Sequence, residues 1–373
     1  MIESIKFNCL YFKGNIPCQP NKLRNKVCAT CDEYKPITKR ILIVKLGAIG
    51  DVIRTTPLAV KYKSLYPDCH ITWLTLSPDI LPSSQINTIY KFDFASVYAI
   101  QNMVFDIAIN LDKETEACAL LKDVKASEKY GFIWNNHHID VATPNAENKL
   151  ITGLFDNISK ENKKHYLDEI FEICHLQFNN EPYLLNVDHL LTEKWTSLKK
   201  QAGGKPVIGL NTGCGKRWTT RLWPNKYWIE LVKKLKNSGY YPVLLGGEAE
   251  DENNRVLEKQ SEAFYPGHFS LKEFIAVTAN CDLIVTQVSM MMHIATALRI
   301  PLVLMNNIFN KSEFYLYNNG VIVEPTTGCD CYYGNTCKRD KSCMHDISAE
   351  TIEEQIRYIL SDQRKFERGQ QSK

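Results

Sequence analysis

An aspartate follows the most regular strand-like run of the sequence and a two-glycine turn. In "ILIVKLGAIGDVIRTTPL", residues 41 to 58, the apolar run leads to Gly47 and Gly50, and a helix is predicted from Asp51. A carboxylate in this place can cap the helix by accepting hydrogen bonds from its first free amides. It can also act as a general base that takes a proton from a bound hydroxyl group. The position alone leaves both interpretations open.

Hydroxyl groups, glycines and cations gather in a second stretch, "NTGCGKRWTTRLWP", which follows another strand-like run and precedes a predicted helix. Such groups ahead of a helix N-terminus suit a diphosphate, because free amides and positive charge converge there. A solvated basic loop is the alternative interpretation. The predicted diphosphate ligands in this stretch are Thr212, Gly213, Lys216 and Arg221.

Two later segments carry further candidates for donor binding. In "LLGGEAEDENN", Glu248 follows two glycines and can accept hydrogen bonds from a ribose or base, or simply favour the start of a helix. In "TQVSMMMHIATAL", Ser289 is predicted to cap a helix on which Met290 and His293 point toward the same site. Methionines in this setting are also ordinary core residues.

Asp112 and Lys113 are further candidates for contact with a ligand. They end the strand-like run "FDIAINLD" and begin the polar stretch that follows it. Ligands of parallel sheets bind beyond the carboxyl ends of the strands. These two side chains are therefore predicted to face a bound ligand, which is the acceptor if the family resemblance given below holds.

Eight of the thirteen cysteines fall into two groups of four. Four thiolates suit a tetrahedral zinc or iron ion, and the segment 1–38 has few large apolar residues, so that a metal would supply folding energy. We expect structural zinc or iron and no catalytic cofactor. Free or structural thiols are the alternative, and the two groups can also share one site. The groups are Cys9, Cys18, Cys28 and Cys31 near the N-terminus, and Cys329, Cys331, Cys337 and Cys343 near the C-terminus.

Composition narrows the class of protein. The 373 residues exceed what one hydrophobic core usually covers, so two domains are expected. The net charge of +3, from 45 basic and 42 acidic residues spread evenly, argues against a nucleic-acid partner. No apolar run approaches the roughly 20 residues that span a bilayer. We expect a cytoplasmic protein without a transmembrane segment. Peripheral association with the inner face of the membrane is compatible with this expectation.

The elements that must position these residues alternate between strand and helix, which predicts α/β units with parallel sheets. In the first half, strands are expected at 41–46, 70–76, 96–100 and 105–112, with a helix at 51–66. In the second half, strands are expected at 206–213, 241–247, 281–286, 301–307 and 320–325. The predicted domains are a Cys-rich extension (1–39), an acceptor domain (40–200), a donor domain (201–350), and a C-terminal helix and tail (351–373).

Three ordered segments resemble the family-9 glycosyltransferases, the group of the ADP-heptose:lipopolysaccharide heptosyltransferases. They are "ILIVKLGAIGDVIRTTPL", "GLNTGCGKRWTTRLWP" and "CDLIVTQVSMMMHIATAL". The resemblance implies a GT-B fold with two Rossmann-like domains facing a cleft. It also implies inverting, metal-independent transfer from a nucleoside-diphosphate heptose, with ADP-heptose as the first expectation, to a glycan, lipid-linked or protein acceptor. Family members often carry cysteines near the C-terminal group, and some relatives bind iron there.

Carried over by position, the family's general base falls on Asp51, with Gly50 beside it on the donor side. The sequence departs from the family where Val288 and Met290 replace an aspartate and a glycine of the motif. Because the phosphate loop and Asp51 are present, we favour altered donor recognition. The alternatives are a catalytically silent nucleotide-sugar-binding or metal-dependent assembly protein, and, least compatible with the long α/β body, a cysteine-based redox protein.

Overall fold

The computed structural model describes residues 2–371, with side chains described as far as Ser361. The chain forms two compact units. The first comprises the residues up to Ile151 together with Asp168–Pro182, and the second comprises Thr152–Leu167 together with the residues from Tyr183 onward. The chain thus enters the second unit, returns to the first and leaves it again, so the units do not follow one simple boundary in the sequence.

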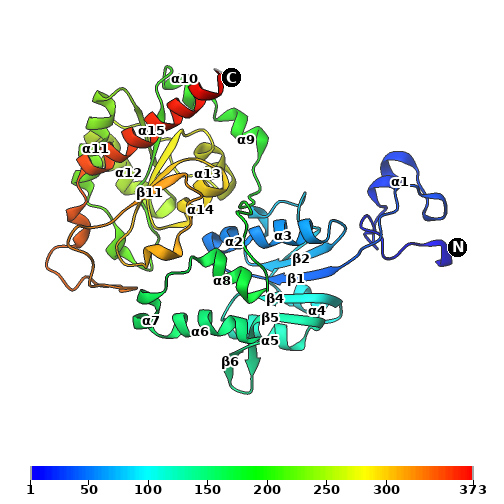
Figure 1. Ribbon diagram of the computed structural model, residues 1–373. Coiled ribbons are helices and arrows are strands. Elements are labelled where there is room, and N and C mark those ends of the chain that lie inside the picture. The colour runs from blue at the N-terminus through cyan, green and yellow to red at the C-terminus, as the bar shows by residue number, and fades with distance from the viewer. Residues whose placement is uncertain (1, 372–373) are drawn as a thin grey trace. The chain divides into compact units, whose positions relative to one another are not determined.

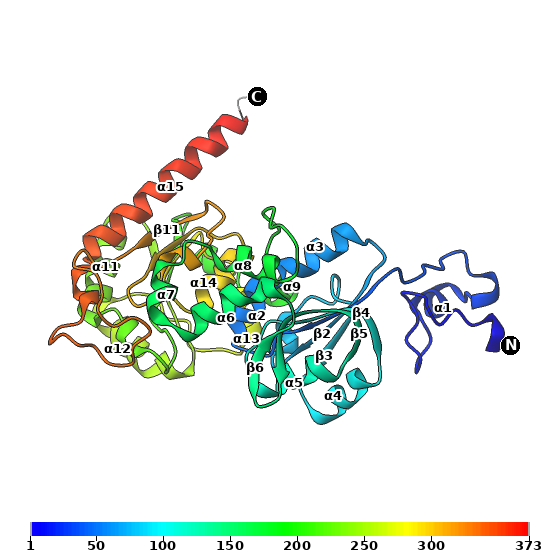
Figure 2. The same cartoon turned by 60° about the horizontal axis from the view of Figure 1, so that its bottom comes forward.

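The first unit is built on a six-stranded sheet in the order β3-β2-β1-β4-β5-β6 (Figure 1). All neighbouring pairs are parallel except β5 and β6, which form an antiparallel hairpin. Helix α3 covers one face, and α4 and α5 cover the other (Figure 2). The strands are β1 (Arg40–Val44), β2 (His70–Thr75), β3 (Thr88–Lys91), β4 (Val104–Asn110), β5 (Lys125–Asn135) and β6 (His138–Val141).

The helices of the first unit are short, and most follow a strand directly. They are α2 (Ile49–Thr55), α3 (Pro57–Leu65), α4 (Phe94–Gln101), α5 (Thr115–Asp123), the start of α6 (Glu147–Leu154) and most of α8 (Tyr166–Ile173). Strand β1 is apolar on both faces, as parallel sheets require: Leu42 and Val44 pack with Leu74 and Ala108 on one face, and the alternating residues Ile41 and Ile43 are buried on the other. The N-terminal segment contributes α1 (Gln19–Arg24) and two short 3-10 turns, Ile2–Ser4 and Cys28–Thr30.

Two predictions for the first unit were wrong. Residues 96–100 form part of helix α4 rather than a strand, because Asp93 caps the helix by accepting a hydrogen bond of 2.8 Å from the Ser96 amide. The helix expected over 51–66 is two helices. Pro57 lacks an amide hydrogen and begins α3, so the α2 ladder ends before it.

The second unit is built on a five-stranded parallel sheet in the order β11-β10-β9-β7-β8. Each strand predicted in the second half of the sequence is confirmed. The strands are β7 (Val207–Asn211), β8 (Tyr241–Leu245), β9 (Leu283–Gln287), β10 (Leu302–Met305) and β11 (Gly320–Val323). The order places the ends of β7 and β9 side by side, and both lead into the segments predicted to bind the donor.

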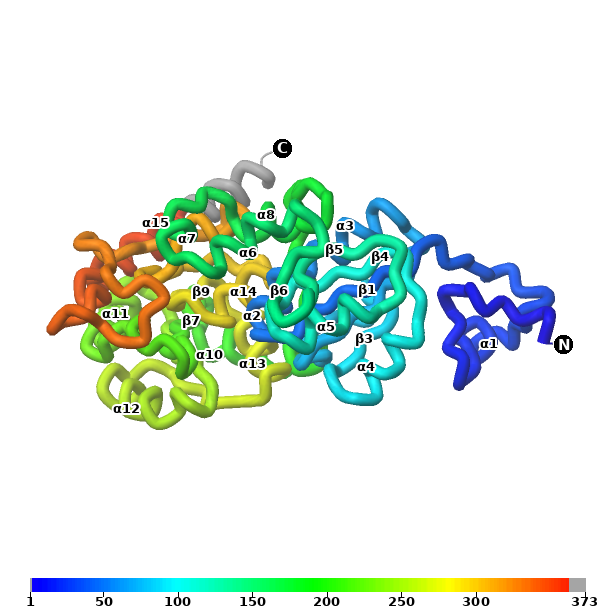
Figure 3. Tube along the Cα trace, turned by 90° about the horizontal axis from the view of Figure 1, so that it is seen from below, coloured from blue at the N-terminus to red at the C-terminus, as the bar shows by residue number. Residues whose placement is uncertain are grey.

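Helices surround this second sheet, and the long C-terminal helix is one of them. Ile352 and Ile356 of α15 are buried in one core with Trp228 of α11. Helix α7 lies near the loop that follows β10 (Figure 3), where Asn310 donates a hydrogen bond of 2.8 Å to the Ser159 carbonyl. The helices are α7 (Asp156–Glu161), α9 (His189–Lys194), α10 (Ser197–Gln201), α11 (Asn225–Asn237), α12 (Asp251–Ser261), α13 (Leu271–Thr278), α14 (Met290–Ala297) and α15 (Ala349–Gln371).

Over the part of the chain that the structure describes, no helix is both long enough and apolar enough to cross a membrane.

Candidate functional site

Asp51 lies in the first turn of α2, two residues inside the helix. The N-cap position belongs to Ala48, so the interpretation of Asp51 as the N-cap residue was wrong. Its Oδ1 lies 2.8 Å from Nη2 of Arg54, one turn along the helix, and its side chain is 35% exposed. A partly exposed carboxylate held in one orientation by a cation is well suited to accept a proton from a bound hydroxyl group.

The loop in front of Asp51 is anchored by a buried ion pair. Asp112, which is only 3% exposed, accepts a hydrogen bond from the Lys45 ammonium through one oxygen and from the Leu46 amide through the other. Burial raises the pKa of the Asp112 carboxyl, and the positive charge of Lys45 opposes that rise. Asn110 holds the backbone at Asp112 through a hydrogen bond of 2.9 Å to its carbonyl. The carboxylate predicted to face the acceptor is thus engaged in holding the β1–α2 loop.

Replacing Asp112 by Asn should be costly, because it leaves the Lys45 charge buried without its partner. We expect a loss of about 3–5 kcal/mol in the free energy of unfolding of the first unit. Asp140→Asn, at a partly exposed position of the hairpin strand β6, is the matched control and should change stability by less than about 1 kcal/mol. Urea unfolding followed by circular dichroism measures both; equal losses in the two variants would contradict the anchoring role.

Lys113 lies beside Asp112 but has different partners. Its ammonium donates a hydrogen bond of 2.8 Å to the Lys149 carbonyl and lies 5.1 Å from the centre of the Phe132 ring. Burial, together with the nearby charge of Lys149, lowers the pKa of Lys113 to about 8. A contact of Lys113 with an acceptor stays a prediction.

In the second unit, the predicted phosphate ligands separate into two kinds. Thr212 is buried at the end of β7, and its hydroxyl donates a hydrogen bond of 2.6 Å to Oδ1 of Asn254. Lys216, in contrast, is exposed. Thr212 therefore stabilises the conformation of the loop, whereas Lys216 is accessible to a diphosphate.

Arg221, like Thr212, is a buried residue that stabilises the loop. It is 6% exposed, and its guanidinium donates to the carbonyl groups of Cys214, Trp218 and Val288. These bonds tie both ends of the phosphate loop to the turn after β9. Arg221 thus holds the loop in shape through its backbone, and a contact of Arg221 with a diphosphate stays a prediction.

The glycines of the donor segments are packed against Glu250. A Cβ atom at Gly213 would lie 2.3 Å from the Glu250 carboxyl group, so a larger residue there would displace the Glu250 side chain. Glu250 also accepts a hydrogen bond of 2.9 Å from the Gly247 amide, whereas Glu248 is exposed at the start of the same turn. Glu250, three residues after Gly247, is thus the carboxylate that returns to the first amide of this turn, and donor binding by Glu248 stays a prediction.

Ser289 caps α14, as predicted, by accepting a hydrogen bond of 3.3 Å from the Met291 amide. Its hydroxyl also lies 3.4 Å from the Asn211 side-chain nitrogen, which joins the end of β7 to the start of α14. Met290 is partly exposed at the first position of the helix. His293 is buried one turn further on, with its ring centre 6.2 Å from that of Tyr183.

The departure from the family motif at Val288 leaves a main-chain contact in place. The Val288 side chain is buried and apolar, so it offers no carboxylate. Its carbonyl oxygen nevertheless accepts a hydrogen bond from Arg221. The link between this turn and the phosphate loop thus runs through the backbone.

None of the eight clustered cysteines forms a disulfide bond in the part of the chain that the structure describes. In the C-terminal group, the Cys331 sulfur accepts a hydrogen bond of 3.2 Å from the Lys338 amide, and the Cys329 sulfur one of 3.4 Å from the Cys331 amide. Amide donors of this kind stabilise thiolates. Among the described residues, no group of three or more His, Cys, Asp or Glu side chains is spaced as a ready metal site. Metal binding by either group stays a prediction.

Comparisons of the sequence with known proteins point to one class of enzyme. The family model for glycosyltransferase family 9 (heptosyltransferase) matches residues 95–321. Lipooligosaccharide heptosyltransferase 2 of Haemophilus influenzae is 24% identical over 299 residues, which make up 70% of this chain and 82% of that protein. The match thus spans most of both chains.

Solved structures show the same fold. The ADP-heptose lipopolysaccharide heptosyltransferase II of E. coli superimposes with a TM-score of 0.63 at 17% identity, over 87% of this chain and 99% of that one. The iron-containing dodecameric glycosyltransferase TibC of enterotoxigenic E. coli gives a TM-score of 0.55 at 14% identity, over 87% and 77%. The α/β architecture with two Rossmann-like sheets is therefore the GT-B fold, as predicted.

Proposed function

The chain belongs to glycosyltransferase family 9, and on that premise we propose that it transfers a heptose from ADP-heptose to an acceptor hydroxyl with inversion at the anomeric carbon. The observation that carries the proposal is the position of Asp51: a partly exposed carboxylate, oriented by Arg54, on a loop anchored by Asp112. The names of two relatives, a lipooligosaccharide heptosyltransferase and an ADP-heptose heptosyltransferase, support the choice of sugar and nucleotide.

In the proposed reaction, Asp51 accepts the proton of the acceptor hydroxyl as that oxygen attacks the anomeric carbon. The new glycosidic bond forms while the bond from the anomeric carbon to the diphosphate oxygen breaks, and ADP leaves with the bonding electrons. Attack from the face opposite the leaving group inverts the configuration. The Lys45–Asp112 pair acts through the loop and is a positioning element, whereas Asp51 is the catalytic residue.

The leaving diphosphate gains negative charge in this step, and the exposed Lys216 is the side chain we propose to stabilise it. Arg221 and Thr212 hold the loop that presents Lys216. Lys216→Ala should therefore raise the KM for the donor about tenfold, which corresponds to ~1.4 kcal/mol of lost binding. Steady-state kinetics with varied donor measures this change.

Arg217→Ala is the matched control for Lys216, because it removes the neighbouring exposed cation. The Arg217 guanidinium lies 4.3 Å from the centre of the Trp218 ring, so a local partner already occupies it. We expect a smaller change in donor KM for this variant. If both variants shifted the KM equally, the effect would be one of general surface charge, and the specific role of Lys216 would be wrong.

For the acceptor, we propose a saccharide carried on a lipid, with transfer at the inner face of the membrane. The support is the lipooligosaccharide acceptor class in the name of the Haemophilus relative. A panel of truncated lipid-linked glycans, free glycans and unmodified protein, each incubated with donor and followed by mass spectrometry, separates the acceptor classes. Modification of protein alone would overturn the lipid-linked choice and leave the donor chemistry intact.

We propose that a metal ion at the C-terminal cysteine group, if bound, has a structural part in this enzyme. The solved relative TibC is iron-containing, and the sulfur atoms here accept amide hydrogen bonds in the way that metal thiolates do. The proposed transfer step itself uses Asp51 and Lys216 and draws no proton or charge from the cysteines.

The experiment that tests the donor is a comparison of nucleotides. Isothermal titration of the full chain with ADP, UDP and GDP should show the tightest binding for ADP, and the product sugar should have inverted anomeric configuration by NMR. Tighter binding and turnover of a UDP- or GDP-linked sugar would overturn the donor assignment. Retention of configuration would overturn the direct displacement.

A further inference from the structure

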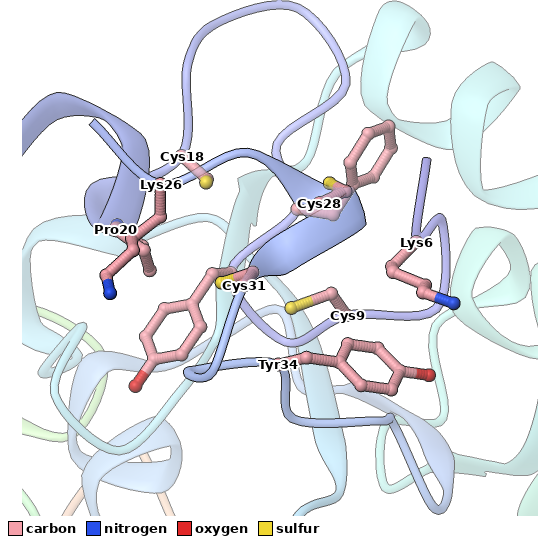
Figure 4. Close-up of a pocket in the computed structure, with 10 residues that line it drawn as sticks. Lys6, Cys9, Cys18, Pro20, Lys26, Cys28, Cys31 and Tyr34 are labelled. Carbon is pink, nitrogen blue, oxygen red and sulfur yellow. The ribbon is translucent and has the colours of Figure 1, made fainter. Parts of the chain in front are cut away.

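Four thiols of the N-terminal segment line a single pocket (Figure 4). Cys9, Cys18, Cys28 and Cys31 contribute to its wall, together with side chains that include Lys6 and Lys26. The free space in this pocket is about 40 Å³, which is room for a single ion or a few waters. Residues from three separate turns of the chain thus bring their sulfur atoms to one place.

The backbone explains why these turns meet. Residues 8–10 and 35–37 run antiparallel: the Leu10 amide donates to the Lys35 carbonyl at 2.8 Å, and the Ile37 amide to the Asn8 carbonyl at 2.7 Å. This pairing closes the segment into a loop with Cys9 at its neck. Cys18 is the N-cap residue of α1. The remaining two cysteines begin and follow the 3-10 turn Cys28–Thr30, which makes a short thiol hook.

Burial of apolar side chains does not account for the fold of this segment. Among residues 2–39, Pro20 alone is buried. Large apolar side chains such as Phe7, Leu23 and Val27 are more than half exposed. The ion pairs of the segment are also on the surface, where each contributes little to stability. Segments this small usually need a disulfide or a metal ion to hold a defined fold.

We propose that Cys9, Cys18, Cys28 and Cys31 bind one zinc ion as four thiolates and that this ion holds the N-terminal segment in its fold. Four thiolates in a tetrahedral arrangement form a complete structural zinc site, with no open position for chemistry. The bound complex carries a net charge of −2, and the Lys6 and Lys26 side chains at the pocket offset part of it. Each thiol that becomes a ligand releases its proton to solvent.

The four sulfur atoms line one pocket, but among the described residues they do not form a group with the geometry of a metal site. Zinc–sulfur bonds of about 2.3 Å require them to move closer. The chain between successive cysteines is short, with eight, nine and two intervening residues in Cys9, Cys18, Cys28 and Cys31, and it is held at the neck. In the proposed complex, these short connections allow the four sulfur atoms to close around one ion.

This site is separate from the C-terminal cysteine group. The N-terminal segment belongs to the first unit and Cys329–Cys343 to the second, and all four ligands of the proposed ion come from one segment of 23 residues, Cys9–Cys31. The inference does not rest on the proposed transfer reaction. The zinc proposal and the proposed transfer reaction can therefore be refuted separately, the first by metal analysis and the second by activity measurements.

Elemental analysis of the full chain tests the proposal. The protein is purified without chelator, loaded with zinc under reducing conditions, and compared with the double variant Cys28→Ser/Cys31→Ser. We expect the double variant to hold one zinc ion per chain fewer than the wild type. Thr30→Ala, which changes an exposed residue between Cys28 and Cys31 and leaves all four thiols in place, is the matched control and should keep the full zinc content.

Two further readouts identify the ligands and the role. Cobalt substitution should give strong thiolate-to-cobalt absorption with tetrahedral bands in the wild type, and the part of it due to this site should be lost in the double variant. Limited proteolysis should cut within residues 2–39 faster in the double variant, while the rate of cleavage in the rest of the chain is unchanged. Equal zinc content in wild type and double variant, iron in place of zinc, or disulfide-linked cysteines in the reduced protein would each overturn the proposal.

Discussion

Asp51→Asn is expected to reduce the rate of sugar transfer by about 10²–10⁴-fold, the usual contribution of a positioned general base. The amide keeps the shape of the side chain and can still accept a hydrogen bond from Arg54, but it cannot take the acceptor proton. Nucleotide affinity should be unchanged, because the proposed diphosphate ligands lie in the second unit. Measuring kcat and calorimetric ADP binding on the same preparation separates the two effects.

The matched control for Asp51 is Glu116→Gln, which removes an exposed first-turn carboxylate from helix α5 in the same unit. Both changes remove one negative charge that favours a helix N-terminus, so their effects on stability should be similar and small. Only the Asp51 variant should lose turnover. Wild-type turnover in Asp51→Asn would show that the carboxylate serves helix stability alone.

Arg221→Met is expected to destabilise the second unit by about 3–5 kcal/mol. The substitution removes a buried guanidinium, and the carbonyl groups of Cys214, Trp218 and Val288 each lose a charge-assisted hydrogen bond. Arg221→Lys should be intermediate, since an ammonium cannot reproduce the planar fork of donors. Urea unfolding followed by tryptophan fluorescence measures the loss, because Trp223 and Trp228 lie in the core of this unit.

Arg217→Met provides the comparison for Arg221, because it is the same substitution at an exposed position of the same loop. It should change the free energy of unfolding by less than about 1 kcal/mol. If Arg221→Met matched this control in stability and lost only donor affinity, Arg221 would be a direct ligand of the diphosphate rather than a clamp of the loop.

The second sheet could be predicted strand by strand because its strands are continuous apolar runs bounded by glycine, proline or polar residues. The first sheet was harder. The run at 96–100 is too short for periodicity to separate strand from helix, and the deciding contact is the local cap by Asp93. Strand β3, with four partly or fully exposed residues, has no apolar run to reveal it.

The candidate site was predictable where its signal is local. Ser289 was expected to cap α14 from its place before the helix, and it does. The roles of Asp112 and Arg221 were not, because their partners are distant in sequence: Lys45 lies 67 residues before Asp112, and Val288 lies 67 residues after Arg221. Only the fold shows that these charged side chains are buried and hold loops in place.

The proposed activity of this chain is the transfer of a sugar from a nucleotide donor. The most direct measurement incubates the full chain with ADP-heptose and the panel of acceptors, and quantifies ADP and heptosylated product by mass spectrometry. We expect equimolar ADP and heptosylated acceptor from the wild type, and both products formed about 10²–10⁴-fold more slowly by Asp51→Asn. Binding of ADP-heptose without release of ADP, with every acceptor tried and in both proteins, would contradict it and identify a catalytically silent nucleotide-sugar-binding protein.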